Sequence, residues 1–306
     1  MFERRITHQR GTDDFRVMDP PTGASHAADD SADLLGDASP SHLADRPPSL
    51  YKTVDAALAS DEARAFHRRL AAALFLANAC DAVEVLSIGF ILTVYEKPSG
   101  EALSASEEEF LTAAVFCGML LGGVVSGVLS DNIGRRKCLL ASLAANTVAA
   151  FLSALSPDYE VLVMCRVVAG LGIGASVPSV FTLAAEMFPT SKRGEFITIV
   201  SSAWMFGSLF VAAVAWVVLG NDSSGARIVA AGSWRTFALL CALSPLTAWV
   251  SCFVISPESP RFLISSGRKA EAVAVLERTV LQGQATVRGT EGWYLARSPA
   301  PLPPSK

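Results

Sequence analysis

Six long apolar blocks, separated by short polar segments, run along the chain from Leu70 to Ile255. A helix needs about 20 apolar residues to cross roughly 30 Å of hydrocarbon, and each block is close to that length. Because lipid offers no hydrogen-bond partners to exposed backbone groups, a bundle of helices is the expected arrangement. The pattern predicts an all-α membrane protein with six transmembrane helices, at about residues 70–95, 110–130, 138–155, 161–188, 196–219 and 234–255.

The segments on either side of this predicted bundle, which covers residues 70–256, are polar. Residues 1–66 are rich in Ser, Asp, Pro, Ala and Gly and bury too little apolar surface to offset the entropy of ordering, so we expect a disordered tail. Residues 257–306 predict a short helix followed by a second disordered, proline-rich tail. Six further spans would need about 120 residues, more than follow Ile255. We therefore expect a half-length chain whose pathway needs a second six-helix half.

The composition narrows the class of protein further. Hydrophobic residues make up 51% of the chain and charged residues 18%, against about 25% charged residues in soluble domains, and the net charge is −4. A soluble enzyme and a basic nucleic-acid-binding protein fit these values poorly. The cysteines lie within or beside apolar blocks and lack metal-ligand spacing, so we expect no metal site, disulfide framework or cofactor. They are Cys80, Cys117, Cys138, Cys165, Cys241 and Cys252.

Lysines and arginines near the ends of the predicted spans fall mostly on one side of the membrane. Because such an excess marks the cytoplasmic side, both termini are predicted to be cytoplasmic, in a plasma membrane or an intracellular vesicle membrane. The opposite side carries few basic residues and the acidic run Glu107–Glu109. A glycosylation sequon at Asn221 falls in the outward loop between the fifth and sixth spans. The basic side holds Arg68, Arg69, Arg135, Arg136, Lys137, Lys192, Arg193, Arg261, Arg268 and Lys269.

Three ionisable residues lie inside the predicted spans, where each charge costs at least about 2.5–3.5 kcal/mol. Asp81 and Glu84 are three residues apart, on one face of the first span. The helix rise of about 1.5 Å per residue places Glu84 and Arg166, in the fourth span, at the same depth, roughly 21 and 22 Å from the cytoplasmic edge. We therefore predict a Glu84–Arg166 ion pair and a freer Asp81.

Two interpretations of these charges stay open. A carboxylate beside a cation in a dry cavity binds and releases a proton as its surroundings change, which would couple a solute to a proton gradient. Alternatively, Glu84 and Arg166 form a permanent salt bridge that holds the first and fourth spans together. For Asp81, a role in proton coupling or substrate binding is the favoured interpretation.

The segment from Gly127 to Lys137 joins the second and third predicted spans and resembles the signature loop of the major facilitator superfamily, GxLxDxxGRRx. Gly127 permits close helix approach, and Gly134 permits a tight turn. Asp131 can cap a neighbouring helix N-terminus, and Arg135 can bind carboxylates in a bidentate geometry. The resemblance implies the N-terminal six-helix bundle of a major facilitator fold, which is one half of a secondary carrier.

Three further motifs follow in the order typical of this superfamily. They are Arg166–Gly174 in the fourth span, then Glu186, Pro189, Arg193 and Gly194, and finally Pro257–Phe262, which is similar to the PESPR motif of sugar porters. The resemblance implies that charged residues of these motifs form a cytoplasmic ion-pair network that holds the outward-open state. The residues assigned to conformational gating are Gly127, Asp131, Gly134, Arg135, Arg136, Glu186, Arg193, Glu258 and Arg261.

Within the superfamily, residues 70–280 most resemble synaptic vesicle glycoprotein 2 and its relatives. The resemblance rests on segments such as Asp81–Val85, Gly172–Pro178, Lys192–Glu195 and Ser233–Arg235. It implies that two tryptophans of the fifth span, Trp204 and Trp216, line a central ligand cavity. For Trp216, a position in the aromatic belt at the membrane surface is equally consistent.

These observations predict a multi-pass membrane protein that transports a small organic solute as a secondary carrier, with Asp81 or Glu84 as candidates for proton coupling. Its expected partners are the lipid bilayer, the solute and a second six-helix half, and we expect no nucleic acid. No catalytic constellation supports an enzyme. The alternative is a non-transporting membrane protein with a transporter fold, acting as a vesicle component, receptor or trafficking regulator.

Overall fold

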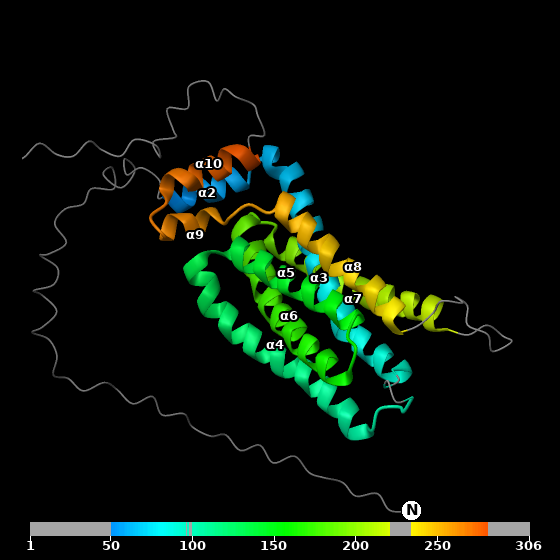
Figure 1. The fold of residues 1–306 in the computed structure, drawn as a ribbon. Helices are drawn as coiled ribbons and strands as arrows, with labels where there is room; N and C mark the ends of the chain where they lie inside the picture. Colours follow the sequence, from blue (N-terminus) through cyan, green and yellow to red (C-terminus); the bar gives the residue numbers. More distant parts are fainter. Residues whose placement is uncertain (1–49, 96, 98–99, 221–233, 281–306) are drawn as a thin grey trace, which may run out of the picture. The chain divides into compact units, whose positions relative to one another are not determined.

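The computed structural model describes residues 50–280 except 96, 98–99 and 221–233, and its regular elements within these ranges are helices (Figure 1). Six of the helices are long and apolar enough to cross a membrane, which confirms the predicted fold class. They are α3 Arg64–Val94, α4 Ala105–Ile133, α5 Arg135–Ala154, α6 Tyr159–Met187, α7 Arg193–Leu219 and α8 Trp234–Ile255.

Most of these helices begin a few residues before the apolar blocks that predicted them, because polar first turns continue the helix. The start of α4 shows the reason. Ser104 and Glu107 form a capping box, in which each side chain satisfies a backbone group that the helix leaves free. Apolar patterning marks the buried length of a span, whereas caps fix where the helix begins.

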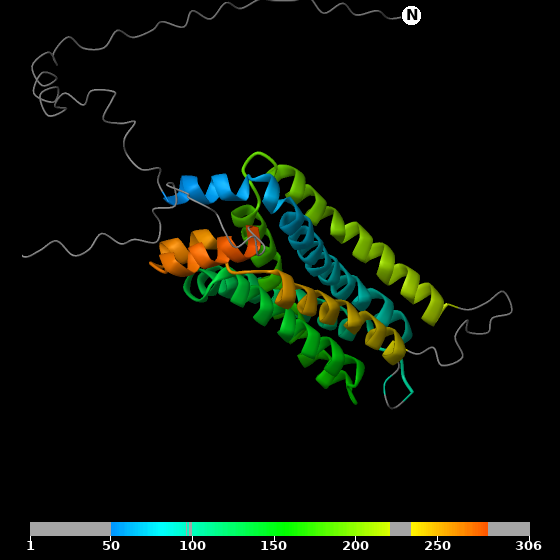
Figure 2. The ribbon, with the colours of Figure 1, turned by 90° about the horizontal axis from the view of Figure 1, so that it is seen from above.

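The bundle is built around α6 and α3. Helix α6 packs against α4 and α5, and α3 packs against α7 and α8 (Figures 1 and 2). Helices α5 and α8 also pack against each other. Glycines allow α4 and α6 to pack closely, because a Cβ atom on any of four glycines would overlap the backbone of the facing helix. These are Gly118, Gly122, Gly170 and Gly174. The expectation that Gly127 permits close helix approach is wrong for the described residues, because a Cβ there would meet nothing within 4 Å.

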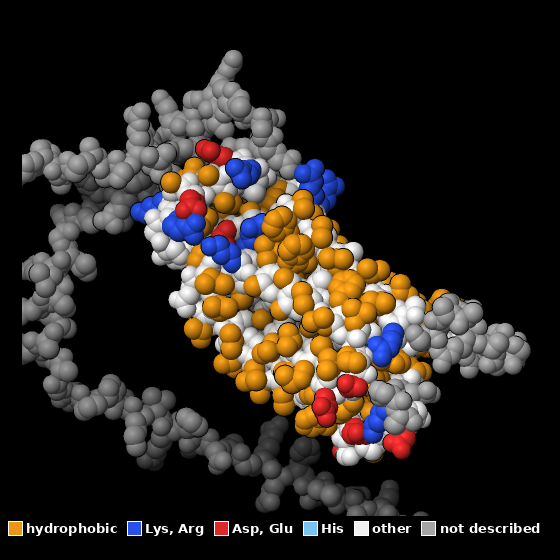
Figure 3. Space-filling view, in the orientation of Figure 1, with side chains coloured by type: hydrophobic (Ala, Val, Ile, Leu, Met, Phe, Trp, Pro, Cys, Tyr) orange, Lys and Arg blue, Asp and Glu red, His pale blue; other side chains and the backbone are white. Residues whose placement is uncertain are grey.

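Charged side chains gather at two ends of the bundle, with apolar side chains between them (Figure 3). We call the end that carries Arg135, Arg136, Arg193 and Arg261 the Arg-rich end, and the end that carries Glu107, Glu108, Glu109 and Glu160 the acidic end. Helices α4 and α7 are the least buried of the six, and both expose large apolar side chains. Examples are Leu120 and Leu121 on α4, and Met205 and Leu209 on α7.

Three short helices form a layer at the Arg-rich end: α2 Leu50–Leu58, α9 Pro260–Ser265 and α10 Lys269–Val280 (Figures 1 and 2). The short helix expected after residue 257 is therefore present. The expectation of disorder through residue 66 is wrong for residues 50–66, because α2 and the start of α3 are helical there. Val54 and Leu58, one turn apart, are buried in a cluster with Phe262, Leu263 and Leu276. The expected tails at 1–49 and 281–306 lie outside the described residues.

Candidate functional site

An ion pair between α3 and α6 lies deep inside the bundle. Arg166 Nη1 donates to Glu84 Oε2 at 3.1 Å, and the two side chains are 3% and 1% exposed. The pair predicted from helix depth is therefore present. Two charges taken this far from water are costly unless each neutralises the other, so the pair joins α3 to α6 inside the bundle.

Asp81 lies one turn from this pair and has a different environment. Its side chain is completely buried, and Ser176 Oγ of α6 donates a hydrogen bond to Asp81 Oδ2 at 2.7 Å. No lysine or arginine pairs with Asp81 among the described residues. The structure thus places a neutral hydroxyl, and not a cation, against the second carboxyl, in keeping with the freer Asp81 that the sequence predicts.

The rest of the bundle fixes the position of α3 against α6. A Cβ atom on Gly207 of α7 would overlap the carbonyl oxygen of Ala79, so α7 lies directly against α3 at the level of Asp81. Asn78 Nδ2 donates to Val200 O of α7 at 2.9 Å, which fixes the same two helices one turn away. The acidic face of α3 is consequently turned toward α6.

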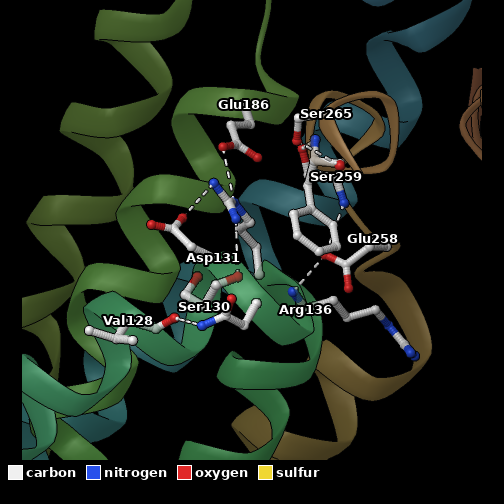
Figure 4. Close-up of polar contacts among 11 residues, drawn as sticks. Val128, Ser130, Asp131, Arg136, Glu186, Glu258, Ser259 and Ser265 are labelled. Atoms are coloured by element: carbon white, nitrogen blue, oxygen red, sulfur yellow. Dashed lines mark hydrogen bonds and ion pairs between the residues drawn. The ribbon is translucent and has the colours of Figure 1, made fainter. Parts of the chain in front are cut away.

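At the Arg-rich end, Arg135 contacts residues of α4, α6 and α9, and Figure 4 labels two of these residues, Asp131 and Glu186. Its Nε donates to Glu186 Oε1 at 3.2 Å, and its Nη2 lies 3.0 Å from Asp131 Oδ1. The guanidinium also stacks over the ring of Phe262, 4.9 Å from its centroid. The predicted Arg135–Glu186 contact is present, and Asp131 pairs with Arg135 one turn away on the next helix rather than capping a helix N-terminus.

The turn between α4 and α5 depends on Gly134. Its φ of +108° favours glycine, and a Cβ there would overlap Glu258 Oε2. This close approach lets Glu258 Oε1 accept a hydrogen bond from the backbone N–H of Arg136 at 3.0 Å, at the N-terminus of α5 (Figure 4). Negative charge is favourable at that end of a helix. The tight turn predicted at Gly134 is confirmed.

Three motif residues depart from the ion-pair network that the resemblance implies. Glu258 bonds to backbone, and Arg136 donates to the carbonyl oxygens of Ser256 and Phe253, which lie in or just after α8. Arg261 Nη2 lies 2.5 Å from Asp55 Oδ1 on α2. Glu258 therefore bonds to the N-terminus of α5, and Arg261 pairs with α2, a partner that the motifs alone do not indicate.

Arg193 has no ion pair within the described ranges, and its buried Nε and Nη2 atoms lack hydrogen-bond partners there. It begins α7, beside the turn that follows Glu186. The place predicted for Arg193 in the network is therefore not reproduced. The two tryptophans differ as well: Trp204 is half-buried on α7, and Trp216 is 70% exposed. Asn221 lies outside the described residues.

Sequence reasoning missed a second set of contacts, at the acidic end. Lys97 pairs with Glu107 at 2.9 Å, and Tyr159 Oη donates to the carbonyl oxygen of Glu107. The hydrogen bond with Glu107 raises the pKa of Lys97. The spacing from Ser104 to Glu107 is the signal that could have indicated this helix start. Within the parts of the chain that the structure describes, no group of three or more His, Cys, Asp or Glu residues is placed to hold a metal ion.

A bundle of six spans with buried charges on its first and fourth helices defines the class: a membrane transporter fold. The family model described as "Sugar (and other) transporter" matches residues 79–291, and the chain belongs to this family. A structure of the major facilitator superfamily proton:xylose symporter XylE superimposes with a TM-score of 0.61. That alignment has 21% sequence identity and covers 71% of this chain and 50% of XylE, so it shows the fold.

Synaptic vesicle glycoproteins are among the curated proteins that this chain resembles. Synaptic vesicle glycoprotein 2A of Rattus norvegicus is 38% identical over 208 residues, which are 67% of this chain and 28% of that protein. Synaptic vesicle glycoprotein 2C of the same species is 35% identical over 221 residues, which are 69% of this chain and 30% of that protein. The chain is therefore a multi-pass membrane protein similar to these relatives over less than a third of their length.

Proposed function

We propose that this chain is one six-helix half of a secondary carrier that moves a small organic solute across a membrane in exchange for, or together with, protons. The observation that carries the proposal is the buried acidic face of α3, where Glu84 meets Arg166 and Asp81 meets the neutral groups of Ser176 and Cys80. Ionisable groups at such depth are costly, so their presence marks a functional pathway more often than a structural need.

The chemistry follows from the two environments. Protonation of Glu84 removes the negative charge that Arg166 neutralises, and the freed guanidinium becomes a donor for solute oxygens. Asp81 has a hydroxyl and a thiol beside it and no cation among the described residues, so it gains or loses a proton when its surroundings change. Each proton thus alters the contact between α3 and α6, and rocking of one six-helix half against another would use that change.

The remaining parts of the proposal concern assembly and orientation. A second six-helix half would cover the exposed apolar faces of α4 and α7 and complete the pathway. The Arg-rich end faces the cytoplasm, where the Arg135–Glu186 contact acts in gating, and both termini lie on that side. Trp204 and Trp216 contribute to the solute cavity from α7.

The direct test is uptake by proteoliposomes that contain the full chain, measured across a panel of sugars, organic cations and organic anions with and without an inward proton gradient. We expect gradient-driven uptake of at least one solute, and loss of the proton-driven part in Asp81→Asn and Glu84→Gln. Glu109→Gln, an exposed carboxyl at the acidic end, is the matched control and keeps its uptake.

A second candidate function is a non-transporting vesicle membrane protein. It is favoured by the greater identity with the synaptic vesicle glycoproteins, 38%, than with the xylose symporter, 21%. No flux for any solute of the panel, from protein whose helical content and thermal transition are intact, would favour this candidate over the carrier.

A further inference from the structure

A buried amide on α5 stands out among the polar residues of the bundle. Asn146 is completely inaccessible to solvent, yet neither Oδ1 nor Nδ2 has a hydrogen-bond partner within the described residues. Glu84 Oε1 and Arg166 Nε are among the other buried atoms that lack a partner within the described residues. Buried polar atoms nearly always have partners, so a cluster of such atoms needs an explanation.

The helix contacts place Asn146 at the level of the ion pair. Ser176 of α6 bonds to Asp81, and Gly172, one turn before Ser176, lies against Asn146, where an added Cβ would approach the Asn146 Cβ at 3.0 Å. Glu84 lies one turn beyond Asp81 in the same direction, because α3 and α6 are antiparallel. From the helix rise, Asn146 and Glu84 differ in depth by only about 2 Å.

The face of α5 that carries Asn146 is turned toward the interior of the bundle, where α5 packs on α6 and α8 and these two helices pack on α3. Leu139 and Leu143, seven and three residues earlier on the same stripe, belong to a buried cluster with Leu74 and Ala77 of α3. Asn146 continues this stripe one turn further, past Ala77, where α3 presents Asp81 and Glu84. The amide and the ion pair therefore lie at the same depth on inward-facing sides of their helices, which supports placing them in one layer of the core.

The hydrogen-bonding groups in this layer are complementary to one water molecule. Glu84 Oε1 and Asn146 Oδ1 are acceptors, and Arg166 Nε and Asn146 Nδ2 are donors. A water molecule offers two donors and two acceptors, and buried waters typically make about three hydrogen bonds to such groups. In the arrangement that the structure describes, these atoms are inaccessible to solvent, so a molecule as small as water is the partner that fits them.

We propose that Asn146, Glu84 and Arg166 enclose an internal water site, and that Asn146 is a positioning residue that holds this water on Glu84 Oε1. The water donates a hydrogen bond to the ionised carboxylate and so stabilises its charge, and it is the neighbour through which Glu84 exchanges its proton. This inference rests on the proposed function of Glu84, but it concerns a site that can be measured without transport.

Other groups around Glu84 are accounted for. On its own helix Asp81 and Cys80 lie nearby, α6 supplies Arg166, and α8 supplies the buried thiol of Cys241. The buried positions of α7 that face α3 carry no ionisable side chain. Asn146 is the amide that α5 contributes.

The test is an infrared pH titration of the full chain in lipid nanodiscs, with the Glu84 carboxyl band assigned by its loss in Glu84→Gln. Asn146→Leu removes the water, disfavours the ionised carboxylate, and should move the midpoint upward by about one pH unit, the size expected for one lost hydrogen bond to a charged group. Asn146→Ser, which keeps a polar group and leaves room for water, should retain the original midpoint.

Asn78→Leu is the matched control, because Asn78 is a buried amide whose donor is already bonded to Val200; the midpoint should stay in place. An unchanged midpoint in Asn146→Leu would overturn the inference. A rise in the thermal transition of this variant would add that no water is bound at the amide. If Asn146→Leu does not fold, density decides: an ordered water within about 3.2 Å of Glu84 Oε1 and the Asn146 amide supports the site, and its absence at a resolution that shows other internal waters contradicts it. If the Glu84 midpoint shifts in Asn146→Leu but the chain takes up no solute, the water site stands and the proposed carrier function is contradicted.

Discussion

The two carboxyls of α3 lie one turn apart and have different partners. Glu84 has the guanidinium of Arg166, and Asp81 has the hydroxyl of Ser176. The effect of neutralising one of these side chains on stability depends on whether its partner is left with an unpaired charge. Removing a cation from a buried pair leaves an uncompensated charge, whereas Asp81→Asn keeps an acceptor for Ser176.

Arg166→Gln should therefore destabilise the bundle by about 3–5 kcal/mol, because the Glu84 carboxylate loses its counter-charge in the core. The double variant Glu84→Gln/Arg166→Gln should recover most of this loss, and Asp81→Asn should change stability by less than about 1 kcal/mol. Thermal or denaturant unfolding in detergent micelles measures all three. Equal stability of the Arg166→Gln single variant and the wild-type chain would mean that the pair is not buried.

The Glu84–Arg166 pair could be predicted from sequence because a regular helix converts residue number into depth. The partner of Arg261 could not. Asp55 lies 206 positions earlier, in a stretch whose polar composition hides a short helix, and only tertiary packing brings the two together. The orphaned amide of Asn146 was likewise invisible, because its significance depends on which face of α5 turns inward.

Among the helices, α4 and α6 make the closest contact through glycine. A Cβ on Gly170 would overlap the carbonyl oxygen of Val115, and neither backbone can retreat without separating the two helices. From the sequence, close helix approach was expected at Gly127. The structure places it at Gly118 and Gly122, which face α6, whereas Gly127 faces open space.

Gly170→Ala should cost about 1–3 kcal/mol of stability through overpacking at this contact. Gly89→Ala on α3 is the control, since an added Cβ there meets nothing within 4 Å, and it should be neutral or stabilise the helix by up to about 1 kcal/mol. The measurement is the thermal unfolding midpoint of each purified variant. The same midpoint shift in both variants would show that α4 and α6 are further apart than described.

Helix α2 is held to the layer at the Arg-rich end mainly by apolar contacts. Leu58 is fully buried against this layer, whereas the Asp55–Arg261 pair is partly exposed, and exposed pairs contribute less than about 1 kcal/mol. Leu58→Ala should cost about 2–5 kcal/mol locally and increase hydrogen exchange across residues 50–58. Asp55→Asn should leave exchange there nearly unchanged, and the reverse order would show that the ion pair is what retains α2.

At the scale of the whole described bundle, charge separates into an Arg-rich end and an acidic end with an apolar belt between them (Figure 3). This distribution was predictable from sequence, because spans alternate in direction and their loops alternate in charge. The layer of α2, α9 and α10 was predictable only in part. The few apolar residues of α2 are buried only because α9 and α10 pack against them, and the sequence does not show this contact.

The orientation can be read by labelling cysteines from one side of a membrane. Lys137→Cys at the Arg-rich end should react with a membrane-impermeant maleimide only after permeabilisation of intact cells. Glu109→Cys at the acidic end should react without it, because positive loops stay in the cytoplasm. A chain in which exposed Cys117 is replaced by Ser provides the background. The opposite labelling order would reverse the assigned topology.

The central claim is that the buried carboxyls of α3 couple proton movement to solute movement. The most direct measurement is the luminal pH of proteoliposomes, reported by an enclosed dye, when a transported solute is added outside without an imposed gradient. We expect solute to drive a pH change in vesicles that contain the wild-type chain or Glu109→Gln, and none in vesicles that contain Glu84→Gln. Solute uptake without any pH change, or an equal pH change in Glu84→Gln, would contradict the account.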